Sequence, residues 1–179
     1  MAWTPSTSPK TSWSVRHPLP EIICNTSPLQ YLHQIGQLDL LSQLTGQIIV
    51  PTAVAVELAE GRRRGVDVPV PETLPWVDLR TPSSEQVIRL VADLGPGETA
   101  VLLLALECAD PVVILDDGLA RRHAEVLGIP LTGTLGILLD AKQRGLVSSV
   151  APLIAELQQQ GFRLSARTRG LVLRRAGEA

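Results

Sequence analysis

Four short polar sites stand out in this chain because each lies beside or within an apolar run. They are Asn25-Thr26-Ser27, Glu57, Glu98 and Asp116-Asp117. Each apolar run is typical of a buried strand or helix, so the polar groups are expected at an edge of a sheet rather than scattered over the surface. Three acids and one amide gathered there would form an oxygen-rich pocket. Such pockets suit Mg²⁺ or Mn²⁺, and those that hold two metal ions cleave phosphodiesters.

Each of these residues also has a purely structural explanation. Glu57 would lie on an exposed helix face, where acids are common. Glu98 would place favourable negative charge at a helix N-terminus. Asn25 would order a turn through its own backbone contacts. One of the two aspartates should cap the following helix; we assign that role to Asp117, which leaves Asp116 free to point into a crevice.

The elements that must position these residues alternate between strands and helices. Apolar runs predict strands at 21–24, 47–50, 76–79 and 112–115 and an extended segment at 129–132. Helices are predicted at 28–41 with a break near Gly36, and at 51–60, 83–93, 98–109, 118–127, 134–145, 150–160 and 168–175. The central strands are apolar on both sides, which indicates an α/β fold with a parallel sheet between two layers of helices. Ligands of such folds bind beyond the carboxyl ends of the strands, where Asn25 and Asp116 are expected.

Local signals set the expected ends of several helices. Ser27 is the expected N-cap of the first helix, with Pro28 at its first position. Gly61 is expected to end the helix that begins at Pro51, so that 62–65 starts a loop. Thr134 is expected to cap the helix that follows the last extended segment.

Composition limits the class of protein. The 179 residues suffice for one domain, which we expect at 21–179 after a disordered tail at 1–20 that is rich in Ser, Thr and Pro. Aromatic residues make up only 3% of the chain and the formal net charge is −2, so nucleic acid would have to bind through local basic clusters. The two cysteines are expected to be buried thiols. No run suits a membrane span or a secretory leader, so a cytoplasmic protein is expected.

Taken together and in order, four segments make the chain recognisable. They are Asn25-Thr26-Ser27-Pro28-Leu29, Glu57 in a short helix, Gly97-Glu98-Thr99-Ala100 and Leu115-Asp116-Asp117. This combination resembles a PIN domain over about residues 21 to 175. The segment Thr132-Gly133-Thr134-Leu135-Gly136 makes it similar to a prokaryotic PIN-like branch that includes VapC-type toxin ribonucleases. The resemblance implies a three-layer α/β/α fold with a central parallel sheet.

The resemblance also implies a metal-dependent endoribonuclease. The four family acids fall on Asn25, Glu57, Glu98 and Asp116, which would hold one or two Mg²⁺ or Mn²⁺ ions that activate water and stabilise the leaving oxygen. Without metal, repulsion between clustered carboxylates should raise at least one pKa. The chain departs from the family at Asn25, where Asp is usual. An amide oxygen still binds a hard cation, but the site loses one negative charge, so metal affinity and activity should both fall.

RNA is the implied substrate, and several residues near the predicted site are candidates to contact it. Hydroxyls and arginines that follow or flank the acids are the candidates: Thr26, Ser27, Arg62, Arg63, Arg121, Arg122, Thr132 and Thr134. The backbone at 132–134 could hold a phosphate, although a plain helix cap is the simpler explanation. The arginines of the C-terminal tail are expected to form a solvated face.

Partners and alternatives follow from the same resemblance. It suggests an antitoxin protein and a homodimer as partners, whereas the lack of a long apolar run predicts no membrane association. A second hypothesis, favoured by Asn25, is a catalytically weakened PIN-like module that binds RNA or a protein. A third is a flavodoxin-like or receiver-type α/β domain, which ranks last because the acids come late in the chain and no suitably placed lysine follows Asp116.

Overall fold

The computed structural model describes residues 19–83 and 93–178, and at its centre lies a five-stranded sheet whose paired strands all run parallel. The strands are β1 (Glu21–Cys24), β2 (Ile48–Pro51), β3 (Val77–Arg80), β4 (Pro111–Ile114) and β5 (Leu131–Thr132). Their order is β3-β2-β1-β4-β5, so the chain moves outward from β1 to β3 and then returns to place β4 on the other side of β1. This reversal creates a topological switch point between β1 and β4, where open α/β sheets bind their ligands.

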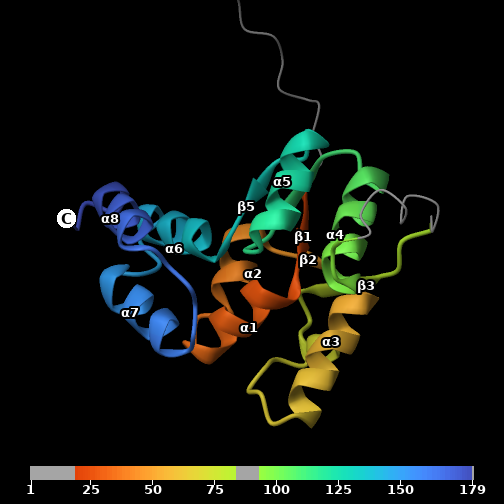
Figure 1. The fold of residues 1–179 in the computed structure, drawn as a ribbon, viewed down its shortest axis with the longest axis horizontal. Coiled ribbons are helices and arrows are strands. Elements are labelled where there is room, and N and C mark those ends of the chain that lie inside the picture. The colour runs from red at the N-terminus through yellow and green to blue at the C-terminus, as the bar shows by residue number, and fades with distance from the viewer. Residues whose placement is uncertain (1–18, 84–92, 179) are drawn as a thin grey trace, which may run out of the picture.

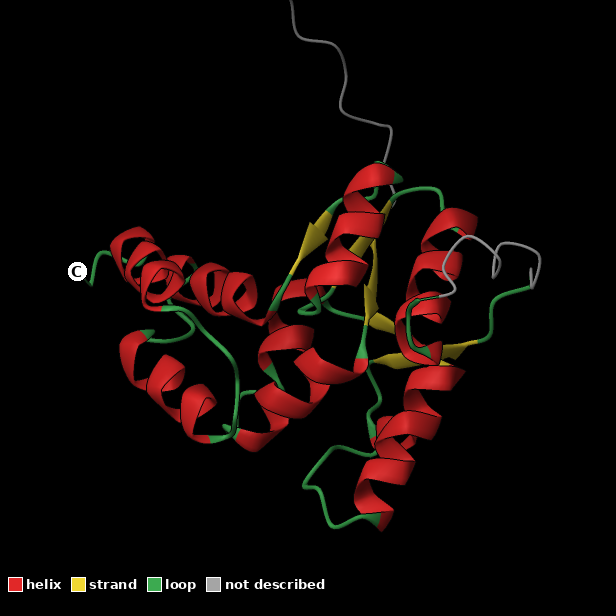
Figure 2. Ribbon diagram, in the orientation of Figure 1, coloured by secondary structure: helices red, strands yellow, loops and turns green. Residues whose placement is uncertain are grey.

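Helices cover both faces of this sheet (Figures 1 and 2). The α-helices are α1 (Thr26–Gln34), α2 (Leu40–Thr45), α3 (Thr52–Arg63), α4 (Pro96–Glu107), α5 (Gly118–Val126), α6 (Thr134–Gln143), α7 (Ala151–Gln159) and α8 (Ala166–Arg175), and η1 (Pro71–Thr73) is a 3₁₀ turn. Helix α4 packs against β1, β2 and β4 with α3 and α5 beside it, whereas α2 and α6 contact each other next to β2 and β5, and α8 packs on α6. The predicted three-layer α/β/α fold with a parallel sheet is confirmed.

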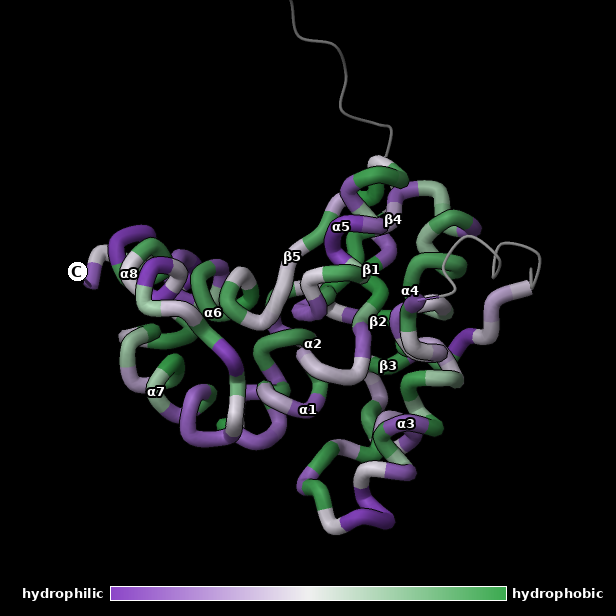
Figure 3. The backbone as a smooth tube through the Cα atoms, viewed as in Figure 1, coloured by the Kyte–Doolittle hydropathy of each residue, from purple (hydrophilic) through white to green (hydrophobic). Residues whose placement is uncertain are grey.

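The core is aliphatic, as the scarcity of aromatic residues requires. The β-branched residues Ile23, Val113 and Ile114 are fully buried in the two central strands, which suits their stiff side chains to a pleated surface. Helix α4 buries every residue from Ala100 to Ala105. Each fully buried Leu, Ile or Val contributes about 1.5–3 kcal/mol relative to exposure. Figure 3 shows that the strands and α4 are mostly hydrophobic, whereas α8 is more hydrophilic.

The start of α1 differs from the prediction. Asn25, not Ser27, is the N-cap, and the helix begins at Thr26, which places Pro28 at its third position. Proline is tolerated there because backbone N–H groups of the first turn have no intrahelical acceptor. The Asn25 side chain makes no capping hydrogen bond, since its amide is used elsewhere.

The end of α3 also differs. The helix continues through Gly61 to Arg63, so the predicted loop at 62–65 is wrong for its first two residues. Glu60 forms ion pairs with Arg63 at 2.9 Å and with Arg64 at 3.0 Å, which extends the last turn. Arg62 Nη1 donates to the carbonyl of Pro69 at 2.6 Å and holds the following loop against the helix.

Other boundaries shift by one or two residues, which is the usual uncertainty of element ends. Strands β2, β3 and β4 are each displaced by one position from the predicted ranges, and α4 starts at Pro96 rather than Glu98. The N-cap of α6 is Gly133, so Thr134 is the first residue of that helix and not its cap. The helix predicted at 83–93 and the tail at 1–20 lie almost wholly outside the described residues. Within the described ranges, no helix has the length and apolarity needed to cross a membrane.

The chain's last described residue, Glu178, closes the C-terminal helices. Its carboxylate accepts hydrogen bonds from the Ser149 hydroxyl at 2.7 Å and from the backbone N–H groups of Val150 at 2.7 Å and Ala151 at 2.8 Å, at the start of α7. Lys142 of α6 completes the set with an ion pair at 2.5 Å. These contacts lower the pKa of Glu178 to about 2, with Lys142 the largest cause. One carboxylate therefore ties α6, α7 and the end of α8 together.

Candidate functional site

Asn25 lies directly after β1, fully buried at the switch point of the sheet. Its Nδ2 donates to Glu98 Oε1 at 3.0 Å, and Glu98 is in the first turn of α4. Its Oδ1 is buried and accepts no hydrogen bond from any described residue. An unsatisfied buried acceptor costs about 1–3 kcal/mol. Because the described part of the fold supplies no donor to this oxygen, its partner would have to come from outside the fold.

Glu57 is not an acid on an exposed helix face, which was its purely structural explanation. From the middle of α3 its Oε2 accepts a short hydrogen bond from the Thr26 hydroxyl of α1, and its Oε1 accepts from the backbone N–H of Gly97 at 2.8 Å. A Cβ added at Gly97 would lie 2.6–2.9 Å from the carboxyl atoms of Glu57. Gly97 is thus required for the close approach of α4 to Glu57, a role that no sequence signal indicated.

Asp116 follows β4 and is held by the start of α6. Its Oδ1 accepts from the backbone N–H of Thr134 at 2.8 Å, and its Oδ2 accepts from the Thr134 hydroxyl at 2.6 Å. The neighbouring Asp117 accepts from the N–H groups of Leu119 and Ala120, both at 2.9 Å, which confirms it as the N-cap of α5. The expected capping role of Asp117 is therefore present, whereas Asp116 is not free, because Thr134 engages both its oxygens.

The electrostatics of Asp116 differ in cause from the expectation. Its pKa is raised, as expected for at least one acid of the site, but the main cause is burial of the carboxyl rather than repulsion by another carboxylate. The two hydrogen bonds from Thr134 and the charge of Arg121 act on the pKa in the opposite direction. Arg121 Nη1 is fixed by the carbonyls of Leu115 at 2.7 Å and Thr132 at 3.2 Å. A Cβ at Gly133 would approach Asp116 Oδ1 to 2.8 Å, so this glycine makes room for the carboxyl.

The predicted residues form two linked groups. Asn25 bonds to Glu98, and Thr26 bonds to Glu57, so two hydrogen-bonded pairs from adjacent residues join the start of α1 to α4 and α3. Asp116 follows the adjacent strand β4, in which Ile114 pairs with Cys24 and accepts from the Asn25 N–H at 3.2 Å. Over residues 19–83 and 93–178, no three His, Cys, Asp or Glu side chains are arranged to hold a metal ion. The carboxylates engage hydroxyl, amide and backbone donors instead of one another.

The remaining candidates are placed unevenly. Arg121 and Thr132 line a cavity together with Asp116. Arg63 lines a separate hollow with Glu57 but is paired with Glu60. The side chains of Ser27 and Arg122 have no hydrogen bond or ion pair to any described residue. Arg62 is occupied by the Pro69 carbonyl.

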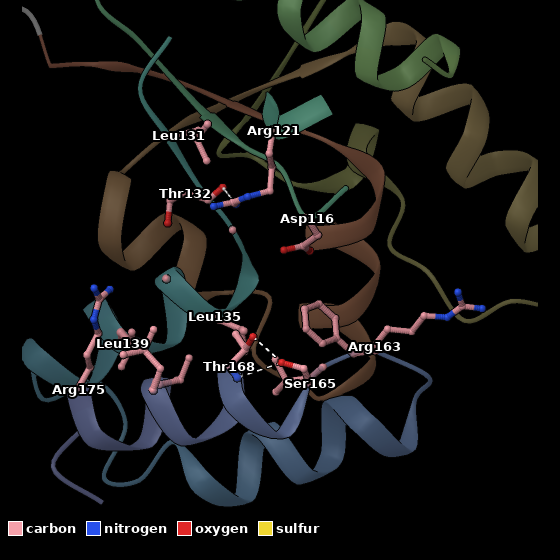
Figure 4. A pocket seen from close by; sticks show the side chains of 16 residues that line it. Asp116, Arg121, Leu131, Thr132, Leu135, Leu139, Arg163, Ser165, Thr168 and Arg175 are labelled. Atoms are coloured by element: carbon pink, nitrogen blue, oxygen red, sulfur yellow. Dashed lines mark hydrogen bonds between the residues drawn. The ribbon is translucent and has the colours of Figure 1, made fainter. Parts of the chain in front are cut away.

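Residues of the C-terminal helices share the Asp116 cavity, and no local signal in the sequence pointed to them (Figure 4). The cavity has a volume of about 540 Å³ and lies between the β5–α6 segment and the α7–α8 region. Arg163, Ser165, Thr168 and Arg175 contribute to its wall. These arginines belong to the tail that we expected to be a solvated face. Arg175 lies on α8, which packs on α6, and Arg163 lies in the segment before α8.

Comparison with known proteins gives one match. The family model DUF3368, described as a PIN domain, covers residues 21–178. No curated protein and no solved structure matches the chain. The matched range contains every described strand and helix, together with Asn25, Glu57, Glu98 and Asp116. The chain therefore belongs to the PIN-domain family.

Proposed function

We propose that this chain is a Mg²⁺- or Mn²⁺-dependent endoribonuclease that hydrolyses phosphodiester bonds at the β1–β4 switch point. The observation that carries the proposal is the buried Asn25 Oδ1, which has no hydrogen-bond partner among the described residues and belongs to an amide held by Glu98. PIN-domain membership supports a nuclease in general. The position of Asp116 at the end of the neighbouring strand supports the same location.

The residues present fit a hard divalent cation by their chemistry. Asn25, Glu57, Glu98 and Asp116 offer only oxygen donors, which Mg²⁺ and Mn²⁺ prefer. The orphaned Asn25 oxygen would gain the partner that the fold does not provide. A bound cation would supply Lewis acidity, favouring a deprotonated water and offsetting the charge that develops on the phosphate.

The chain's own residues hold and orient this site. Thr26 and Gly97 fix both oxygens of Glu57, and Thr134 fixes both oxygens of Asp116. Each carboxylate oxygen keeps a second lone pair for a cation. The charge of Arg121 offsets part of the rise in the pKa of Asp116 that burial causes. Its guanidinium donates to a backbone carbonyl and not to any described acid, so its charge is available to attract a phosphate. Thr132, which lines the cavity with Asp116, and Ser27, in the first turn of α1, are further hydroxyls that we propose to contact RNA.

A second candidate function rests on the Asn25–Glu98 hydrogen bond. An amide donor at this position neutralises part of the Glu98 charge without a cation. A weakened PIN-like module that binds RNA, or a protein, would keep such a bond permanently. The two functions are separated by cleavage assays on the purified protein.

The first experiment measures cleavage of a mixed structured RNA pool with Mg²⁺, with Mn²⁺ and with chelator, beside an Asp116→Ala variant. Metal-dependent cleavage that is lost in the variant is the expected result. RNA binding without cleavage would contradict the nuclease and favour the weakened module. If neither cleavage nor RNA binding occurs with any metal, the nuclease and the RNA-binding module are both wrong, and the protein-binding module is left.

The finer role that we propose is a toxin of a toxin–antitoxin pair, which acts on RNA in the cytoplasm and pairs with a second copy of itself. Its support is the family membership and the toxin-like Thr132–Gly136 segment. Expression of the wild-type chain should arrest bacterial growth, whereas Asp116→Ala should not. Equal growth of both strains, at equal protein levels, would contradict the toxin role alone.

A further inference from the structure

We propose that the cavity between Asp116 and α8 is the track for a single RNA strand leading away from the scissile phosphate. This inference rests on the proposed function, because it takes Asp116 as part of the reacting centre. The track is defined by Arg121, Arg163, Ser165, Thr168, Leu171 and Arg175. Asp116 lines the same cavity, so a strand bound in it is continuous with the site.

The charge of the track opposes that of the whole chain. The formal net charge is −2, yet the cavity lining contains three arginines and only one acid, Asp116. Arg163 and Arg175 are exposed, and neither forms a hydrogen bond or ion pair with any described residue. Figure 4 shows them toward opposite ends of the view, with Asp116 between them. Arginines without protein partners along a cavity that Asp116 also lines suit phosphate groups.

The floor of the track suits bases and riboses rather than water. It includes Leu131, Leu135, Leu139, Leu164 and Leu171, and Leu171 is 43% exposed on α8. Base faces are accessible only in a splayed single strand, because a duplex hides them in its stack. Ser165 and Thr168 add hydroxyls whose oxygens lie 2.8 Å apart at the start of α8. Apolar floor, hydroxyls and guanidinium groups together match a single strand.

The dimensions of α8 set the reach of the track. Thr168 and Arg175 are seven residues apart on one helix, which corresponds to about 10 Å along its axis. A strand that contacts both must extend beyond the nucleotides at the scissile bond. The track should therefore act on affinity for longer RNA, and not on hydrolysis of a minimal substrate.

The test measures binding of a short fluorescein-labelled single-stranded RNA by anisotropy, in chelator and over a range of salt. The variant Arg163→Gln/Arg175→Gln is compared with Arg167→Gln/Arg174→Gln, which removes the same charge from exposed residues of the same region outside the cavity. We expect the first variant to weaken binding on the order of tenfold and to reduce the salt slope by about 1.4, from about 0.7 per phosphate contact. The control should resemble wild type.

A second pair of variants tests the apolar floor. Leu171→Glu places a charge in the track, whereas Leu106→Glu places it at an equally exposed leucine of α4, since Leu106 is 47% exposed and outside the cavity. Only Leu171→Glu should weaken RNA binding, and unlabelled duplex RNA should compete less well than single strand. Thermal melts verify that all variants fold.

The outcomes separate this inference from the proposed function. If both double arginine variants weaken RNA binding equally, or if neither does, the track is wrong. A protein would then be the candidate occupant of the cavity. If wild type cleaves RNA while the cavity variants bind and cleave like their controls, the nuclease stands and the track is wrong. If wild type never cleaves but binds RNA through Arg163 and Arg175, the cavity is an RNA-binding site, and both the nuclease and the path from a scissile phosphate are wrong.

Discussion

The Asn25 amide donates to the Glu98 carboxylate across 3.0 Å, joining the end of β1 to the start of α4. The contact needs an N–H at position 25, because two carboxylates at this distance would repel each other. This hydrogen bond therefore allows the two side chains to lie together in the metal-free protein, with no cation between them. The same amide leaves its oxygen buried and without a described partner.

Asn25→Asp should make the stability of the protein depend on metal. Replacing the donor by a carboxylate should cost about 1–3 kcal/mol in chelator, and each kcal/mol corresponds to a Tm decrease of about 2–4 °C for a chain of this size. Mn²⁺ should raise the Tm of the variant more than that of wild type. Adding Glu98→Gln to this variant should remove both effects, since the amide so introduced can donate to the new carboxylate. Parallel Mn²⁺ responses in wild type and variant would contradict this account.

Asp116→Asn should stabilise the metal-free protein at neutral pH. Burial raises the pKa of Asp116 above its usual 3.8, so folding favours the protonated form. The resulting penalty is absent below the usual value and grows as the pH rises through the folded-state pKa. The Tm advantage of the variant should therefore be large at neutral pH and small near pH 4, measured in chelator.

Asp117→Asn is the matched control for that pH series. Asp117 is exposed, and Asn caps helices about as well as Asp, so its Tm should follow wild type at every pH. A pH-independent gain in Asp116→Asn, or the same pH-dependent gain in Asp117→Asn, would show that burial of the Asp116 charge is not the cause.

Thr134→Val should weaken metal binding through Asp116. The substitution keeps the backbone N–H bond to Oδ1 but removes the hydroxyl bond to Oδ2. Losing a residue that orients a ligand typically costs 10–100-fold in metal affinity or activity, roughly the range we expect here. Thr134→Ser keeps the hydroxyl and should restore Mn²⁺ affinity in a calorimetric titration. Equal Mn²⁺ affinity in the Val and Ser variants would rule out this positioning role.

Gly97→Ala should disturb Glu57 specifically. The new methyl group would lie 2.6–2.9 Å from the Glu57 carboxyl atoms, so that side chain must move. We expect metal-dependent cleavage to fall, by roughly the 10–100-fold typical of a displaced ligand environment. Gly118→Ala, at the start of α5 where the methyl group meets nothing within 4 Å, should retain wild-type cleavage. Similar losses in both variants would assign the effect to helix starts in general.

Most of the fold was predictable because its signals are local. The β-branched run at Val112, Val113 and Ile114 predicts a buried strand wherever it occurs, and Asp117 caps the next helix through contacts two and three residues away. The ends of α1 and α3 were mispredicted because tertiary and ionic contacts decide them. Asn25 uses its side chain on Glu98, and Glu60 extends α3 by pairing with Arg63 and Arg64.

The candidate site was predictable in its residues but not in its contacts. Family resemblance points to Asn25, Glu57, Glu98 and Asp116, but the Asn25–Glu98 bond joins residues 73 positions apart, and its geometry depends on how α4 packs on the sheet. The role of Gly97 is visible only once α4 meets Glu57. Arg163 and Arg175 carry no motif, so their place in the wall of the Asp116 cavity follows from the packing of the C-terminal segment.

Glu178→Gln should loosen the C-terminal helices in a pH-dependent way. The pKa of Glu178 is lowered from its usual 4.5 to about 2, so its stabilising effect is present above 4.5 and is lost as the pH falls toward 2. The Tm of wild type should exceed that of the variant at neutral pH, and the two should converge in acid. Glu156→Gln, at an exposed position of α7, should match wild type throughout. A Tm difference that persists unchanged in acid would contradict the role of the Glu178 charge.

The Glu178 contacts also bear on how the protein should be handled at the bench. Because this carboxylate ties the end of α8 to α6 and the start of α7, a peptide fused behind residue 179 is attached next to the helix that carries Arg175 of the cavity wall. A purification handle or fluorescent reporter placed there should alter RNA affinity while leaving the sheet intact. Assays of this protein are therefore best made after such a fusion has been cleaved off.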